Sequence, residues 1–219
     1  MITNVKASFE LMGNIVLGFP YMCIDSLLAH LEFRRKLGDD YRLLSSKFVT
    51  KDIPSLPIRR TGDVYHCSVS MFPNETLQSM QTFYKRFAEN CLGSANGRID
   101  RGRGFFKDYV LRTPFTCTDR LDFYASLTTD ADWLRELLVG LLGLGKDINI
   151  GFGWIKSFKV QEIEEDRGLI DPKDSVAMRP IPISMLKEYA DVERLNYKAP
   201  YWDPDTVAKC AVPLSKVRI

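Results

Sequence analysis

The sequence predicts an α+β fold whose core elements follow one another as strand, helix, strand, strand, helix and strand. Apolar residues alternate with polar ones near the start of the chain, and they recur at helical spacing in later stretches. Short runs rich in β-branched and aromatic residues are bounded by glycine and proline. With 219 residues, 45% of them apolar, the chain can bury a sizeable core.

The start of the chain supplies the first strand and the first helix. The strand is expected within residues 4–18, where alternate positions are apolar: Val5, Ala7, Phe9 and Leu11. A helix should begin at Asp25 or Ser26, end at Gly38 and bury one apolar stripe: Leu27, Leu28, Leu31 and Phe33. Residues 39–63 contain several helix breakers and indicate an irregular insertion.

The remaining elements are expected after residue 63. Residues 64–72 should form a strand, residues 75–90 a helix, and residues 105–113 and 121–128 two further strands. A second helix should follow the cap at 129–130 and bury its apolar stripe: Trp133, Leu134, Leu137, Leu138 and Leu141. A last strand carries Trp154, Phe158 and Val160 on one face.

The order of these elements is the split βαβ arrangement of a ferredoxin-like (RRM-like, βαββαβ) domain, which we place at residues 1–164. Residues 165–219 are predicted to form a mostly extended C-terminal tail with one short helix near 184–190. Proline fixes the tail at 179–182 and 199–202, so these segments could dock on a neighbouring protein or wrap the chain's own core.

Basic charge is concentrated in one part of the chain. The whole chain carries a net charge of +2, but residues 85–113 hold seven basic and three acidic side chains, a net +4, which leaves −2 elsewhere. Flexible cations interleaved with aromatic rings suit single-stranded RNA, whereas the alternative is a solvated loop whose rings pack into the core. The candidate RNA contacts here are Arg98, Arg101, Arg103, Phe105, Phe106 and Lys107.

A glycine-rich stretch at residues 143–153, the glycine loop, lies between the second helix and the last strand. Glycine lets backbone approach a ligand and exposes N–H groups to phosphate. The loop has neither the Walker spacing nor the strand-to-helix position of a dinucleotide fingerprint. A helix end with a tight turn is the alternative. The candidate RNA contacts are Gly145, Lys146, Asn149, Gly151, Phe152 and Gly153.

Signals for catalysis, metals and membranes are weak. The five cysteines form no CxxC pair and, with only two histidines to add, predict neither a zinc site nor disulfides; we expect no cofactor and a reducing, cytoplasmic compartment. We also expect neither secretion nor membrane insertion, because no long apolar run or signal segment is present. His30 could be the general acid/base of a metal-independent ribonuclease, but a packed histidine is the commoner explanation.

Several short segments resemble one known family. The helix start at 24–31 (Ile-Asp-Ser-Leu-Leu-Ala-His-Leu) and the glycine loop resemble RAMP proteins of CRISPR systems. The tail segments at 179–182 (Arg-Pro-Ile-Pro), 200–202 (Pro-Tyr-Trp) and 210–213 (Cys-Ala-Val-Pro) narrow the resemblance to the type IV effector subunit of the group-five RAMP family. The resemblance covers nearly the whole chain. Because many RAMP proteins share the glycine loop, the helix start and the tail are the more specific part.

The resemblance implies a non-catalytic RNA-binding subunit of a type IV CRISPR RNA-guided surveillance complex, which acts in antiviral defence and plasmid interference. A basic inserted thumb is expected within residues 73–118. The partners would be the 5′ handle of the guide RNA, which the subunit caps, the backbone RAMP subunits and the large subunit. Target DNA is a further candidate, because subunits near this end can read a short flanking motif. The alternative is a His30-dependent endoribonuclease that processes precursor guide RNA.

Overall fold

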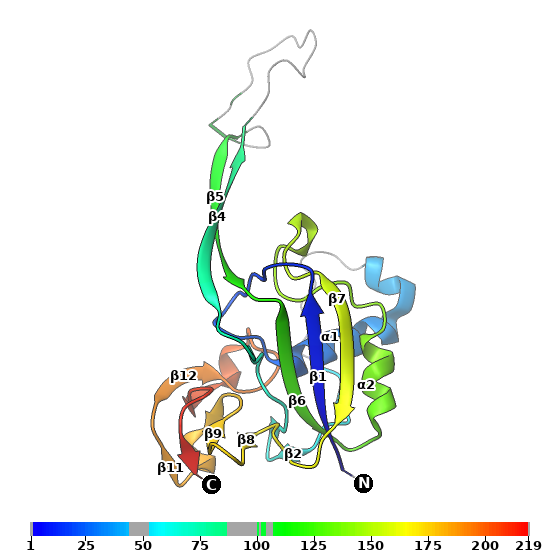
Figure 1. The fold of residues 1–219 in the computed structure, drawn as a ribbon, viewed down its shortest axis with the longest axis vertical. Helices are drawn as coiled ribbons and strands as arrows, with labels where there is room; N and C mark the ends of the chain where they lie inside the picture. Colours follow the sequence, from blue (N-terminus) through cyan, green and yellow to red (C-terminus); the bar gives the residue numbers. More distant parts are fainter. Residues whose placement is uncertain (1, 44–52, 87–99, 101, 104–106, 219) are drawn as a thin grey trace.

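A three-stranded antiparallel sheet with the order β6–β1–β7 lies at the centre of the computed structural model (Figure 1). The structure describes residues 2–43, 53–86, 100, 102–103 and 107–218. The central strands are β1 (Thr3–Leu11), β6 (Arg120–Leu127) and β7 (Ile155–Glu162). β1 buries alternate residues, as its sequence predicts, and pairs with β6 on one side and β7 on the other.

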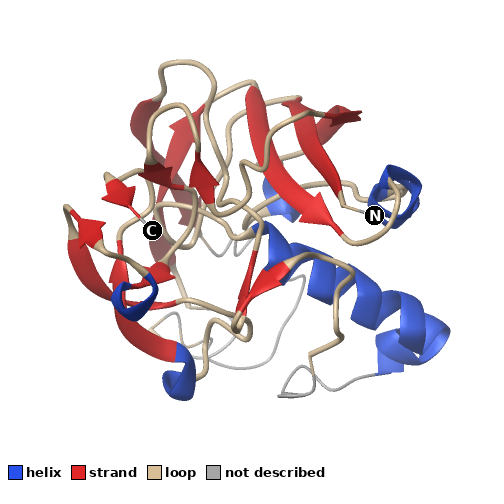
Figure 2. Cartoon of the chain, turned by 90° about the horizontal axis from the view of Figure 1, so that it is seen from below, coloured by secondary structure: helices blue, strands red, loops and turns tan. Residues whose placement is uncertain are grey.

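Two helices, α1 (Ile24–Leu37) and α2 (Ala131–Leu138), pack on one face of this sheet and enclose the main apolar core with it. Figure 2 shows the longer helix, α1, on one side of the strands. The N-terminus of α2 is capped as predicted, because Asp130 accepts hydrogen bonds from the N–H groups of Asp132 and Trp133. α2 ends at Leu138, three residues before Leu141, which is the last residue of the predicted apolar stripe.

A buried carboxylate joins the two helices. Glu32 lies on the core face of α1 and is 5% exposed. Its Oε1 accepts a hydrogen bond from Trp133 Nε1 of α2 at 2.9 Å and pairs with Arg35 at 2.8 Å. The core face of α1 therefore carries polar as well as apolar side chains, and simple hydrophobic spacing describes it only in part.

The predicted strand at 64–72 is only partly regular. Its first two residues form β3 (Val64–Tyr65), which pairs with β2 (Arg60–Thr61), and the rest meets β6 through isolated bridges, Cys67 with Ala125 and Met71 with Asp122. The α+β class is confirmed as a mixed fold of two helices and many strands. An uninterrupted fourth strand, which a regular βαββαβ sheet contains, is not formed by these residues.

The helix predicted at 75–90 is wrong for the residues that the structure describes. Leu77–Lys85 forms strand β4, which pairs with β5 (Tyr109–Cys117) in an antiparallel hairpin that projects away from the central sheet (Figure 1). Most of the hairpin is exposed on both faces, so the apolar spacing in its sequence marks no buried face. Residues 87–90 and the predicted strand start at 105–106 lie outside the described residues.

The C-terminal tail folds into a small β-rich unit, here called the C-terminal unit (residues 165–218). Its strands form one three-stranded sheet, β10–β13–β12, and two two-stranded sheets, the hairpin β8–β9 and the non-consecutive pair β11–β14. The predicted helix near 184–190 is only a 3-10 turn, Ile183–Met185. The bounds are β8 Ile170–Asp171, β9 Val176–Ala177, β10 Ile181–Pro182, β11 Glu188–Tyr189, β12 Val192–Asn196, β13 Val207–Ala211 and β14 Val217–Arg218.

The guanidinium of Arg179, which is 1% exposed, joins the C-terminal unit to the rest of the protein. Its Nη1 donates to the carbonyl oxygen of Tyr65 at 3.0 Å, and its Nη2 donates to Asp25 Oδ2 at 3.0 Å and to the Tyr201 hydroxyl at 2.6 Å. The Tyr201 hydroxyl in turn donates to Asp25. One side chain therefore connects the start of α1, the irregular strand and the tail.

The buried charge of Arg179 is compensated by these partners. Burial disfavours the charged guanidinium, but the carboxylate of Asp25 and the hydroxyl of Tyr201 raise the pKa of Arg179 above its usual value. A buried pair of this kind contributes little net stability against an apolar pair of the same volume, but loss of one partner leaves the other charge uncompensated. The pair thus links the C-terminal unit to α1, beside the backbone hydrogen bond from Val69 to Met178.

A second polar cluster holds the connection that enters the C-terminal unit. Asp166 Oδ2 lies 2.6 Å from His66 Nδ1 and 3.2 Å from Arg59 Nη1, and His66 Nε2 lies 2.7 Å from Thr61 Oγ1. Burial acts against ionisation of Asp166, but hydrogen bonds from His66, Ser126 and the backbone of Gly168 outweigh it and lower its pKa to about 2.

Neither helix in the described part of the chain is long and apolar enough to cross a membrane.

Replacement of Asp25 by Asn should destabilise the protein by about 3–5 kcal/mol, because the Arg179 charge stays buried without its carboxylate. The double variant Asp25→Asn/Arg179→Met should lose less than the sum of the single losses. Urea unfolding of the two single variants and the double variant measures this difference. Losses that add within about 0.5 kcal/mol would show that the two side chains do not act as a pair.

Asp166 should make stability depend on pH in the acid range. Its folded pKa of about 2 lies below the unfolded value, so its contribution is present above about pH 4 and is lost as pH falls to about 2. At pH 7 the free energy of unfolding of wild type should exceed that of Asp166→Asn by up to about 2 kcal/mol. Denaturant unfolding of both proteins between pH 2 and 7 measures this difference in stability. Glu75→Gln is the control for the loss of one exposed negative charge. A gap that does not change with pH would contradict this account.

Candidate RNA-binding surface

The glycine loop is closed by backbone hydrogen bonds at its base. The N–H of Leu144 donates to the carbonyl of Gly153, and the N–H of Gly153 donates to the carbonyl of Asn14, each at 2.8 Å. The N–H of Lys146 donates to the carbonyl of Val16, also at 2.8 Å. A 3-10 turn, Ile148–Ile150, forms the tip of the loop. The loop is thus a fixed structure set beside the chain that leaves β1.

The glycines of the loop have different roles. Gly145 and Gly153 have φ angles of 82° and 63°, and a side chain at either position would overlap a backbone carbonyl oxygen of a neighbouring segment. Folding itself therefore requires these two glycines. Gly151, with a φ of 105°, is exposed and has open space where a side chain would be, so a ligand can approach its backbone, although its N–H already donates to the carbonyl of Ile148 at 3.1 Å.

The side chains of the loop divide into exposed and packed groups. Lys146 and Asn149 are exposed. Phe152 is only 9% exposed, and its ring packs against Phe83 and Phe115 of the hairpin at centroid distances of 6.2 and 5.6 Å. Because this ring is used for packing, we retain Phe152 as the contact that orients the hairpin and not as a direct RNA contact.

The hairpin combines cations with exposed aromatic rings. Tyr84 is 64% and Tyr109 49% exposed. The guanidinium of Arg86 lies 5.9 Å from the centroid of the Tyr84 ring, and the ammonium of Lys85 lies 5.6 Å from that of Tyr109. Lys85, Arg86 and Tyr109 belong to the basic segment 85–113 that the sequence indicates, but the helix predicted at 75–90 hid the pairing of β4 with β5 that brings them together with Tyr84. Rings with cations beside them can stack on bases while the cations meet phosphate.

Of the six candidate RNA contacts in the basic segment, two lie among the residues that the structure describes. Arg103 and Lys107 are exposed. Arg98, Arg101, Phe105 and Phe106 lie outside the described residues. Arg103 and Lys107 lie between the two strands in sequence, so the strands that carry Tyr84 and Tyr109 lead toward them.

The structure places His30 on the exposed side of α1, which differs from the expected packing beside the core. Its Nε2 lies 3.5 Å from the hydroxyl of Tyr41, and the two rings meet edge to face at 5.6 Å. Partial burial and the charge of Arg34 lower the pKa of His30, so the ring is neutral near pH 7.

Metal and thiol chemistry have no evident place in this surface. Across the ranges that the structure describes, no group of three or more His, Cys, Asp or Glu could hold a metal ion. Cys23 is 7% exposed, and burial together with the charge of Asp25 raises its pKa to about 12. This thiol stays protonated and is a poor nucleophile at neutral pH.

The solved structures that this chain resembles include a chain of a complex described as "Cryo-EM structure of the Type III-B Cmr-beta bound to cognate target RNA". The TM-score is 0.44 at 11% identity, and the matched region covers 74% of this chain and 61% of that one, less than two thirds of its length. A likeness at this level defines neither fold nor function. A search of curated proteins gave no match.

The family model described as "CRISPR type IV associated protein Csf3" matches residues 59–213. The matched region includes the hairpin, the glycine loop and nearly all of the C-terminal unit. The type IV resemblance that the sequence indicates is therefore confirmed at the level of the family. Because the match extends over more than half of the chain, this protein belongs to the Csf3 family of CRISPR type IV associated proteins.

Proposed function

We propose that this protein is the non-catalytic RAMP subunit of a type IV CRISPR complex that binds and caps the 5′ handle of the guide RNA. The observation that carries the proposal is the projecting hairpin, on which Lys85 and Arg86 accompany exposed Tyr109 and Tyr84. The glycine loop packs against the hairpin, because the ring of Phe152 contacts Phe83 and Phe115. The loop also contributes the exposed side chain of Lys146 to the surface.

The exposed hairpin supports an RNA partner on physical grounds. An isolated two-stranded hairpin is marginally stable in water, and this one exposes Leu77, Met80, Tyr84 and Val110 each by more than half. Stacked bases would cover such rings, and phosphates would neutralise the neighbouring cations. The backbone RAMP subunits and the large subunit are the proposed protein neighbours, and target DNA is a further candidate through its flanking motif.

A second candidate is an endoribonuclease that uses His30. The observation in its favour is the Tyr41 hydroxyl at 3.5 Å from a neutral imidazole, since a neutral histidine can act as a general base. The distance is long for a hydrogen bond, and the pair lies on α1 and the turn after it, Gly38–Leu43, away from the hairpin. We therefore favour the binding role.

Replacement of Arg86, Arg103 and Lys107 by Ala should weaken binding of repeat RNA by roughly tenfold or more and make it less dependent on salt. The slope of log K against log salt should fall by about 2, because each phosphate contact to a single strand contributes about 0.7. Filter binding at four salt concentrations measures the slope.

The matched control for this variant is Lys159, Lys173 and Lys187 to Ala, which removes three exposed cations outside the hairpin and the glycine loop. Affinity and slope should then stay close to wild type, and both triple variants should melt like wild type. If both variants lose the same slope, overall charge and not the hairpin is responsible.

His30→Ala should leave repeat RNA intact and bound, because the binding role needs no proton transfer at this position. Metal-free incubation of labelled precursor RNA with wild type and variant, resolved on a denaturing gel, checks this. Cleavage by wild type that disappears in His30→Ala would establish the ribonuclease in place of the capping subunit. His66→Ala is unsuitable as a control, since His66 is buried in the Asp166 cluster.

A further inference from the structure

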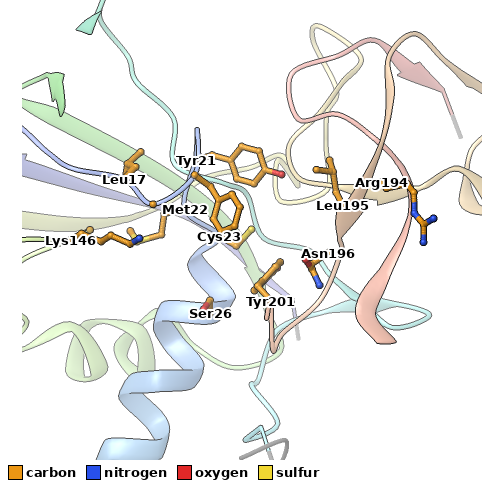
Figure 3. Close-up of a pocket in the computed structure, with 13 residues that line it drawn as sticks. Leu17, Tyr21, Met22, Cys23, Ser26, Lys146, Arg194, Leu195, Asn196 and Tyr201 are labelled. Carbon is orange, nitrogen blue, oxygen red and sulfur yellow. The ribbon is translucent and has the colours of Figure 1, made fainter. Parts of the chain in front are cut away.

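A pocket of about 400 Å³ lies between the start of α1, the glycine loop and strand β12 of the C-terminal unit (Figure 3). It is formed by segments from three distant parts of the sequence. Its lining residues on the β1–α1 connection include Tyr21 and Met22, and those on β12 include Leu195 and Asn196. Figure 3 shows the two groups on opposite sides, with Tyr201 below them. Arg179 holds these sides together, because it binds both Asp25 and the Tyr201 hydroxyl.

The walls of the pocket are apolar and include aromatic rings. Tyr21 and Met22 are half-buried on one side, and Leu195 lies on the other. Phe19, 73% exposed, also lines the pocket. The Cys23 thiol, protonated as described above, adds polarisable surface without chemical reactivity. A flat apolar ligand fits such walls.

The charged residues among those that line the pocket are both cations, Lys146 and Arg194. The backbone N–H of Lys146 donates to the carbonyl of Val16, and its side chain passes over Gly18, where a Cβ would meet the ammonium end. Among the residues that the structure describes, no carboxylate lines the pocket; the charge of Glu193 acts on Tyr21 from nearby, but the two cations of the lining favour an anionic ligand.

Asn196 provides a fixed polar group. Its Nδ2 donates to the carbonyl of Asp203 at 2.9 Å and to Thr206 Oγ1 at 2.7 Å. Both amide hydrogens are thereby used, and Oδ1 is left as the acceptor for a ligand. An acceptor at this place suits the amino or imino group on the edge of a nucleobase.

We propose that this pocket receives one unstacked nucleotide of the RNA. The base lies between the Tyr21–Met22 side and Leu195, its edge faces Asn196, and its phosphates meet Lys146 and Arg194. Lys146 belongs to both the pocket and the glycine loop, so the pocket continues the proposed RNA surface. This inference rests on the proposed function, and it adds a base-binding site to a surface otherwise made for backbone and stacking contacts.

Abasic scanning tests the inference with the full chain and an RNA oligonucleotide of the repeat sequence. Each nucleotide in turn loses its base, and binding is measured to wild type and to Ser26→Leu. Ser26 is exposed and lines the pocket, so Leu narrows the pocket without entering the core. In wild type, one position should lose roughly 5- to 100-fold in affinity, as expected for one lost base contact. Ser26→Leu should bind the intact RNA more weakly than wild type does, by the same factor. Removal of the base at this position should then cause no further loss of affinity for Ser26→Leu.

Ser184→Leu, an exposed serine of the C-terminal unit outside the pocket lining, is the matched control and should behave like wild type. Leu195→Phe fills the pocket from the other side and should reproduce Ser26→Leu. If RNA binds and the loss of affinity at every abasic position is the same for Ser26→Leu as for wild type, the inference fails and the proposed function stands. If Ser26→Leu binds RNA normally but loses a protein subunit on co-purification, the pocket holds a protein segment and the inference fails. If wild type does not bind repeat RNA at low salt, the proposed function itself fails.

Discussion

The buried guanidinium of Arg179 joins three parts of the chain that are far apart in sequence. It donates to the carbonyl oxygens of Tyr65 and Cys67 at 3.0 and 3.4 Å. The Tyr65 carbonyl also accepts from the N–H of Cys67 at 3.0 Å, so a side chain and a tight local turn satisfy the backbone where the strand predicted at 64–72 is interrupted. The same guanidinium reaches Asp25 at the start of α1 and Tyr201 in the tail, so the position of the C-terminal unit depends on it.

The hairpin and the glycine loop form a single assembly. β4 and β5 extend from the body without a sheet behind them, and Phe83 and Phe115 meet the loop at the ring of Phe152. Gly153, next to Phe152, has a backbone conformation and a close approach to Leu144 that exclude a side chain. The glycines therefore serve the proposed RNA surface mainly by holding the loop that orients the hairpin, and the exposed cations and rings are the groups left to meet RNA.

Local regularity made the central elements predictable. The alternation of Val5, Ala7, Phe9 and Leu11 gave β1, and the capping residue Asp130 gave the start of α2. The spacing of Leu77, Met80, Phe83 and Tyr84 predicts a helix where the structure has a hairpin strand, because β4 has no buried face to give that spacing meaning. The sequence of the tail predicts extended backbone, which its strands have, but it carries no signal for the pairing of residues that are far apart.

The groups that hold the site together had no local signal. Asp25 and Arg179 are 154 residues apart, and each alone looks like an ordinary surface charge. The same holds for Asp166 and His66, 100 residues apart. The pocket depends on contacts of the same kind, because β12 reaches the glycine loop only in the folded chain. Candidate cations such as Lys146 and Lys107 could be named from composition, whereas the surfaces they share required the fold.

The most direct test of the account is ultraviolet crosslinking of the assembled complex, with its guide RNA, followed by mass spectrometry of RNA-linked peptides. The account predicts crosslinks from the 5′ handle to peptides that contain Tyr84, Tyr109 and residues 143–153 of this chain. Crosslinks from the handle only to other subunits, or from this chain only to the segment of the guide that pairs with the target, would contradict it.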